Sequence, residues 1–151
     1  MQEKINNSIK VRSSVFSHGG HIPMKYTCEG ENVNPPLEFD GLPENTRSLA
    51  LIVEDPDAPK GVYDHWLLWN ISPQSISENS SPGTSGRNSF GNTGYGGPCP
   101  PSGSHRYFFK VYALDIELDL KTGADKKLLL EAMKDHLLGS GEIMAHYQKK
   151  K

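Results

Sequence analysis

Apolar side chains concentrate in three short segments of the chain, residues 48–54 (SLALIVE), 65–71 (HWLLWNI) and 105–114 (HRYFFKVYAL). Each segment is rich in β-branched and aromatic residues, which is typical of β-strands. All three are apolar at both odd and even positions, whereas a strand with one wet face alternates polar and apolar residues. The pattern therefore predicts strands that are buried on both faces inside a layered, sandwich-like β structure.

A helical pattern occupies residues 125–138 (DKKLLLEAMKDHLL), with Asp125 as the expected N-cap and Gly139 as the expected terminator. One stripe of this helix is formed by Leu129, Met133 and His136 or Leu137. Residues 142–148 (EIMAHYQ) then predict a last short element, and the pattern leaves strand and helix both open.

Turn-forming residues gather between the second and third predicted strands, in residues 79–104. The chain has 15 Gly and 11 Pro, and so long a loop in a compact domain is usually functional or disordered. No repeat and no linker divides the 151 residues. We therefore expect one domain that covers residues 1–151.

Charge is nearly balanced, with 16 Lys and Arg against 18 Asp and Glu. This balance supplies no field for binding nucleic acid. Residues 1–10 carry charges and amides where a secretory signal would be apolar, and no apolar run approaches a membrane span. We therefore expect no nucleic-acid partner, no integral membrane segment and a cytoplasmic location.

The two cysteines, Cys28 and Cys99, have neither CxxC spacing nor a companion metal cluster. In a reducing compartment they would be thiols, and this is the simpler expectation. A single bridge between them stays open at this point.

Ionisable and polar groups stand at the ends of the predicted strands. Successive side chains of a strand point to opposite faces, so Asp55 continues the face of its strand's alternate apolar residues, and His65 begins the face of Leu67, Trp69 and Ile71. His105 and Tyr107 share a face. A strand end is where a core opens into a cavity, so these groups form a candidate shared site. Each residue alone is more often structural.

The sequence motifs around these residues resemble those of a known protein family. Residues 55–59 (DPDAP), 65–71 (HWLLWNI) and 97–109 (GPCPPSGSHRYFF) resemble the signature set of the phosphatidylethanolamine-binding, or Raf-kinase-inhibitor-like, family. The likeness extends to residues 26–28 (YTC) and 34–37 (NPPL), in the order expected of the short bacterial and archaeal branch. It implies a mainly β fold: a β-sandwich with a large antiparallel sheet, Greek-key character and one or two short helices near the C-terminus.

The resemblance also implies a pocket for phosphate-like anions. Its ligand-binding residues would be Asp55, His65, His105, Tyr107, Gly97 and Pro98. An imidazole donates a hydrogen bond to an anionic oxygen, while a carboxylate fixes its tautomer and Tyr107 adds a neutral donor. The glycine turn at Gly96 and Gly97 is expected to bring backbone N–H groups to the ligand. Asp57 is expected to bond within its own turn, and Trp66 to lie in the core.

The function that this pocket implies is binding of a small anionic ligand, phosphate or phosphoethanolamine-like, without a cofactor, a metal or catalysis. A protein target and a homodimer are further expected partners. A second hypothesis is a protease or kinase inhibitor or scaffold. A large exposed apolar patch around the pocket would favour it. A hydrolase using Ser102 or Ser104 beside His105, or a metal enzyme using Asp55, His65 and His105, is the third.

Overall fold

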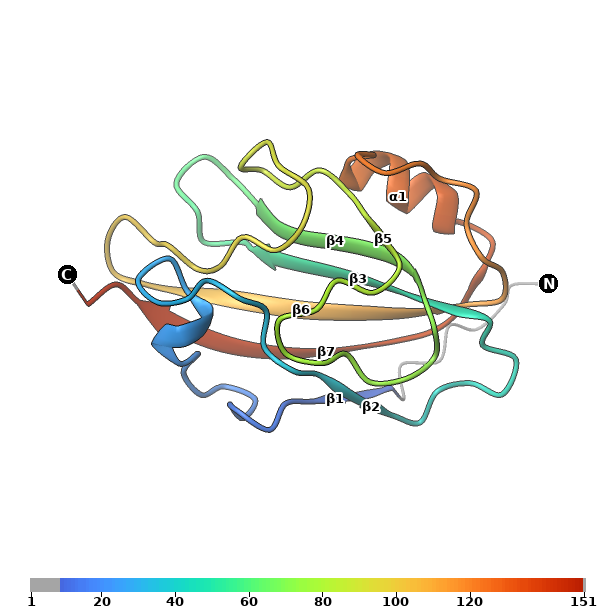
Figure 1. Cartoon of the computed structure of the whole chain (residues 1–151), viewed down its shortest axis with the longest axis horizontal. Helices are drawn as coiled ribbons and strands as arrows, with labels where there is room; N and C mark the ends of the chain where they lie inside the picture. Colours follow the sequence, from blue (N-terminus) through green and yellow to red (C-terminus); the bar gives the residue numbers. More distant parts are fainter. Residues whose placement is uncertain (1–8, 151) are drawn as a thin grey trace.

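The chain folds around one central β-sheet (Figure 1). The computed structural model describes residues 9–150. Its elements, in chain order, are β1 (Lys10–Arg12), the 3-10 turn η1 (Met24–Tyr26), β2 (Glu38–Asp40), β3 (Ser48–Asp55), β4 (Tyr63–Ile71), β5 (Thr84–Ser85), β6 (Ser104–Leu114), α1 (Lys126–Met133) and β7 (Leu137–Gln148).

The main sheet has five strands in the order β5-β4-β3-β6-β7, and every neighbouring pair is antiparallel. β3 lies at the centre, between β4 and β6, so its backbone N–H and C=O groups can pair along both of its edges. Nearly all its side chains are buried, as is usual for a strand that is covered on both faces. The three strands predicted from the sequence are therefore confirmed as β3, β4 and β6. β1 and β2 form a separate two-stranded sheet.

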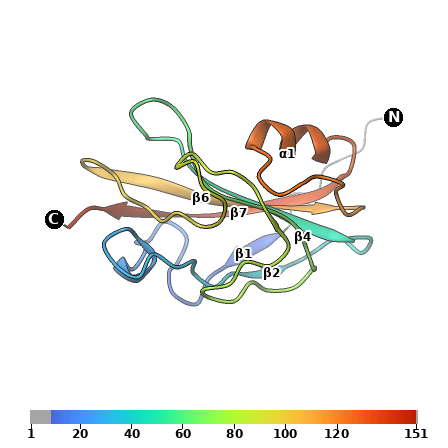
Figure 2. The same ribbon diagram turned by 45° about the horizontal axis from the view of Figure 1, so that its top comes forward.

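The two faces of the main sheet bury different clusters. On one face Leu51, Val53 and Phe109 pack with residues of β1 and of the N-terminal loops. On the other face α1 contributes Leu129 and Met133 to a smaller cluster, and Figure 2 shows α1 on the side of the sheet opposite β1 and β2. A mainly β fold with antiparallel sheets and one helix is thus confirmed among the described residues. The sandwich layering and the Greek-key character stay predictions.

Burial of β6 differs from the expectation. Its odd-numbered residues from His105 to Ala113 are buried, but Arg106 is exposed and Phe108, Lys110 and Tyr112 are half-buried. The prediction that all three strands are covered on both faces is therefore wrong for β6. The cluster under α1 is formed mainly with residues of β3 and β4, so the same face of β6 stays partly open.

The helix begins as predicted and ends earlier. The Asp125 side chain caps α1 by accepting a hydrogen bond from the Leu128 N–H at 3.0 Å. The chain leaves the helix after Met133 through Asp135, whose φ is 71°, so the prediction of Gly139 as terminator is wrong. Gly139 instead pairs with Ala113 inside β7, and residues 142–148 belong to this strand.

A β-bulge interrupts β4 near its end. Leu49 pairs with Ile71 but Leu51 pairs with Leu68, so one extra residue of β4 is accommodated, and Asn70 has a positive φ of 55°. Ile71 therefore lies in the core cluster on the opposite face of the sheet from Leu67, although the sequence predicts both on one face.

None of the helices within residues 9–150 has the length and apolar character needed to span a bilayer.

Candidate functional site

A cavity of about 230 Å³ opens where β3 ends and β4 and β6 begin. Four of the predicted site residues line it together: Asp55, His65, His105 and Tyr107. These polar side chains are almost fully buried, with exposed fractions of 3%, 3%, 7% and 1%. The rest of the lining is Ala58, Pro59, Tyr63, Phe90, Cys99, Pro100 and Pro101. The cavity is therefore largely apolar, with a few polar groups that converge in it, as is usual for small-ligand sites.

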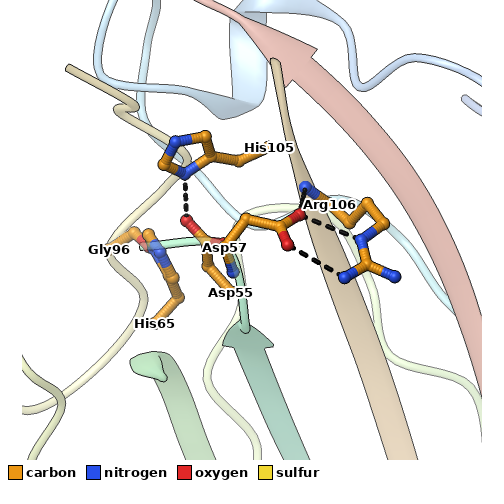
Figure 3. Close-up of polar contacts among 6 residues, drawn as sticks. All are labelled: Asp55, Asp57, His65, Gly96, His105 and Arg106. Carbon is orange, nitrogen blue, oxygen red and sulfur yellow. Dashed lines mark hydrogen bonds and ion pairs between the residues drawn. The ribbon is translucent and has the colours of Figure 1, made fainter. Parts of the chain in front are cut away.

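Asp55 and His105 form a buried pair. The Nδ1 atom of His105 lies 2.6 Å from Oδ2 of Asp55, and Oδ1 of Asp55 accepts the Asp57 N–H at 2.7 Å (Figure 3). A carboxylate accepts, so Nδ1 carries the proton of this hydrogen bond. Nε2 of His105 is then the ring nitrogen that can contact a ligand.

His65 reaches the cavity through a second β-bulge. Val53 pairs with Trp66 and Glu54 pairs with Asp64, so His65 is an extra residue without an opposite partner on β3. Strict alternation would place its side chain with Leu67 and Trp69 on the face under α1. The bulge redirects it into the cavity with Asp55 instead, so the predicted row is wrong at its first member.

The ring of His65 is held by the loop that follows β5. Its Nδ1 donates to the Gly96 carbonyl at 2.7 Å, and the Gly96 N–H donates to the His65 carbonyl at 2.9 Å. Burial lowers the pKa of His65 below its ordinary value of 6.5, while the Gly96 carbonyl and the Asp55 charge act in the opposite direction. His65 is thus favoured in its neutral form, with Nε2 as its other ring nitrogen.

Tyr107 contributes a hydroxyl that has no hydrogen-bond partner among the described residues. Its ring lies edge to face against His65, with the centroids 5.2 Å apart. Burial, and then the nearby Asp55 and Asp57 carboxylates, raise the pKa of Tyr107 far above its ordinary value. A buried hydroxyl without a partner costs free energy, so this neutral donor beside the cavity points to a missing partner.

Asp57 is bound differently from the expectation. The prediction that it bonds its own turn is wrong, since its carboxylate accepts the backbone N–H, Nε and Nη2 of Arg106, each at 2.9 Å. Figure 3 shows this fork beside the Asp55–His105 pair. These bonds lower the pKa of Asp57 to about 2. Arg106 was missed by the sequence analysis, although its place directly after His105 is a signal that an exposed cation stands next to the site.

Gly97 and Pro98 do not line the cavity. The Gly96 N–H is used by His65, and the Gly97 N–H donates to Oδ1 of Asn32 at 2.8 Å, so both N–H groups of the turn are engaged within the protein. Gly97 is needed for a close approach, because a Cβ there would clash with the Tyr26 carbonyl. The structure gives the turn a positioning role behind His65.

A disulfide joins Cys28 to Cys99, 71 residues apart. The expectation of two reduced thiols is therefore wrong. The Cys28 N–H also donates to the Pro98 carbonyl at 3.1 Å. Cys99, Pro100 and Pro101 line the cavity, so the bridge ties its rim to the segment after η1.

The residues named for the catalytic alternatives are arranged as follows. Ser102 and Ser104 are exposed and do not line the cavity. Within residues 9–150 no group of three or more His, Cys, Asp or Glu side chains is placed to hold a metal ion. A larger depression of about 480 Å³ lies beside Lys110, Tyr112 and Glu142, and it contains none of the predicted site residues.

Comparison with known proteins agrees with the fold. The family model described as phosphatidylethanolamine-binding protein matches residues 12–148. The chain belongs to the phosphatidylethanolamine-binding protein family.

Archaeal relatives share close to half of the sequence. A UPF0098 protein of Methanothermobacter thermautotrophicus is 46% identical over 150 residues, which cover 93% of this chain and 99% of that protein. A UPF0098 protein of Pyrococcus horikoshii is 48% identical, over 95% of this chain and 78% of the relative.

Two solved structures have the same fold. One is a putative phosphatidylethanolamine-binding protein homolog from Chlamydia trachomatis, with a TM-score of 0.92 and 41% identity, covering 96% of this chain and 100% of that one. The other is YbcL of E. coli, described as a new member of the mammalian family, with a TM-score of 0.86 and 31% identity, covering 94% and 99%.

Proposed function

We propose that this chain binds a small phosphate-bearing or other anionic ligand in the cavity of Asp55, His65, His105 and Tyr107, without transforming it. The observation that carries the proposal is the way the two histidines are held. Each uses Nδ1 for a hydrogen bond within the protein, to Asp55 or to the Gly96 carbonyl. Both therefore offer Nε2 to one buried cavity, where an anionic oxygen is the matching acceptor.

Binding, rather than turnover, is favoured by the residue types at the cavity. Within residues 9–150, the cavity lining contains no serine, threonine or lysine that could act as a nucleophile, and its one cysteine is in the disulfide. Asp55 and His105 could move a proton, but the described lining gives them no Ser, Thr, Lys or free Cys side chain to activate.

A calorimetric titration with phosphate and with sulfate tests the proposal. We expect saturable binding to the unmodified chain and weaker binding to His65→Gln and His105→Gln. The matched control is His136→Gln, because His136 also pairs with an aspartate, Asp115, at 2.9 Å, but lies outside the cavity lining. Equal affinity in both cavity variants and the control would refute the site.

A second candidate function is control of a protein partner through the cavity rim. It is favoured by two exposed apolar side chains there, Phe90, which lines the cavity, and Val62, beside Tyr63. Exposed apolar groups around a pocket are typical of interaction sites. A Val62→Ser variant, changed outside the cavity lining, should then lose a protein partner that the unmodified chain retains in a pull-down, while phosphate binding persists.

The disulfide bears on where the protein is located. A cytoplasmic chain was expected, yet disulfides persist mainly in oxidising compartments. Thiol labelling of protein that is denatured directly in cell extract would report whether Cys28 and Cys99 are oxidised where the protein works.

A further inference from the structure

The charges around the cavity are unusual for a site that binds anions. Among the described residues that line the cavity, Asp55 has the one carboxylate, and there is neither Lys nor Arg. Arg106, next to His105 in the chain, is half exposed and is engaged by Asp57. Lys60 lines an adjoining depression, not this cavity. The fixed charge that faces the ligand is therefore negative.

The ionisable groups around His65 also come from several elements. Asp55 at the end of β3 and Asp64 in β4 act on it electrostatically, and Tyr63 and Tyr107 contact its ring. Asp64 is paired with Lys126 at 2.7 Å, and Asp57 with Arg106. Asp55 is paired with His105, so a proton on His105 neutralises this pair.

Once His105 is protonated, the one further proton that could compensate a bound anion is on His65, where burial disfavours it. A singly charged ligand together with that proton leaves the cavity without net charge. A second negative charge on the ligand would find no further cation among the described lining residues to compensate it, and it would lie close to the Asp55 carboxylate. Charges in a buried site interact more strongly than in water, so this second charge is costly.

We infer that the cavity selects singly charged tetrahedral oxyanions, of the phosphodiester or sulfate-ester type, over doubly charged phosphate monoesters. The inference rests on the proposed anion binding and adds the charge of the ligand. The buried Tyr107 hydroxyl fits the same class, because it supplies a hydrogen bond to an oxygen without requiring a second charge. A doubly charged ligand would enter only after taking up a proton.

Two probes of the same shape isolate the effect of charge. Methyl sulfate carries one negative charge at all working pH values, whereas methyl phosphate becomes doubly charged above its second pKa of about 6. At about pH 8 we expect methyl sulfate to bind about tenfold more tightly or better, a difference of about 1.4 kcal/mol. Below about pH 6 the ratio should shrink toward one, since methyl phosphate is then singly charged. Dimethyl phosphate, which keeps one charge, should follow methyl sulfate.

Removal of the fixed charge gives the second arm. Asp55→Asn keeps a hydrogen-bonding group beside His105 and should reduce the methyl sulfate to methyl phosphate ratio at about pH 8 several-fold. Asp115→Asn, in the half-exposed Asp115–His136 pair outside the cavity lining, should leave the ratio unchanged. A circular dichroism spectrum matching the unmodified chain establishes that each variant is folded, and the two-probe comparison on the unmodified chain does not depend on them.

The outcomes separate the two proposals. Equal or tighter binding of methyl phosphate at about pH 8, or an unchanged ratio in folded Asp55→Asn, overturns the charge selectivity and leaves anion binding standing. Absence of binding by every probe at both pH values overturns the proposed function and this inference together. A ratio that depends on pH and on Asp55 supports both.

Discussion

The Asp57 carboxylate accepts three hydrogen bonds from Arg106, and the Asp55 carboxylate, two residues earlier in the chain, accepts one from His105. Asp55 and Asp57 leave the end of β3, whereas His105 and Arg106 are consecutive residues of β6. The turn after β3 is therefore fastened to the start of β6 at two adjacent points. The Asp55–His105 pair faces the cavity. The Asp57–Arg106 pair lies at the surface and helps to hold the turn in position against β6.

Asp57 should make the protein sensitive to strong acid. Its pKa is lowered to about 2 in the folded state, below the value of about 3.9 for a free aspartate. Its stabilising contribution is therefore present above about pH 4 and is lost as the pH falls toward 2. We expect the free energy of unfolding of Asp57→Asn to fall less over this interval than that of the unmodified chain, as measured by urea unfolding at a series of pH values. Identical slopes for both proteins would contradict the assignment.

His65 should produce a second pH dependence, at milder acidity. Burial holds its folded pKa below 6.5, so the unfolded chain takes up this proton first as the pH falls. The free energy of unfolding should accordingly decrease as the pH falls through about 6.5 and continue to decrease until the folded pKa is reached. In His65→Gln this part of the decrease should be absent. Guanidinium unfolding at about pH 7.5 and pH 5.5 measures it, with His136→Gln as the control.

The disulfide should contribute to global stability and to the shape of the rim. Cys28 and Cys99 close a long loop, and loss of such a bridge typically costs about 2 to 4 kcal/mol. We expect a Cys28→Ala, Cys99→Ala double variant to lose unfolding free energy in this range and to bind anions more weakly. A reductant should reproduce the effect in the unmodified chain and have none on the double variant. A stability that does not respond to reductant would show that the bridge has no such role.

The two tryptophans offer a matched pair on β4. Nε1 of Trp69 donates to the Leu120 carbonyl at 3.0 Å, whereas Nε1 of Trp66 has no partner among the described residues. Both side chains are fully buried. Replacement by Phe removes similar volume from each, so Trp69→Phe should cost about 1 kcal/mol more than Trp66→Phe, the net value of one hydrogen bond. Chemical denaturation of both variants tests this, and an equal or reversed cost would contradict it.

The sequence predicts the strands well because their apolar runs are long and their ends are marked by turn residues. It also predicts the grouping of Asp55, His105 and Tyr107, since these three follow strict alternation along β3 and β6. His65 is different. Alternation assigns it to the wrong face, and its place at a strand end and the resemblance are what put it in the candidate pocket. A bulge depends on how two strands pair and leaves no local mark in one of them.

The hydrogen bonds that hold the site were also beyond prediction from the sequence. The turn at Gly96 and Gly97 was expected to face the ligand, yet its N–H groups are used by His65 and Asn32, which lie 31 and 65 residues away along the chain from their partners. The partner of Asp57 was missed for the same reason, since Arg106 is 49 residues distant. Such contacts follow from the tertiary fold and not from local sequence.

His105 should control both the affinity for anions and its pH dependence. Anion binding to an imidazolium raises the histidine pKa, so by linkage the affinity is greater below that pKa and declines above it. His105→Gln keeps a donor but removes the charge, and should lower affinity by about 1 to 3 kcal/mol, the range for hydrogen bonds to charged groups. The pH dependence should become flatter. Because phosphate itself changes charge in this pH range, sulfate must be titrated in parallel by calorimetry. If His105→Gln and His65→Gln both bind sulfate as the unmodified chain does, with the same pH profile, the anion has its site elsewhere.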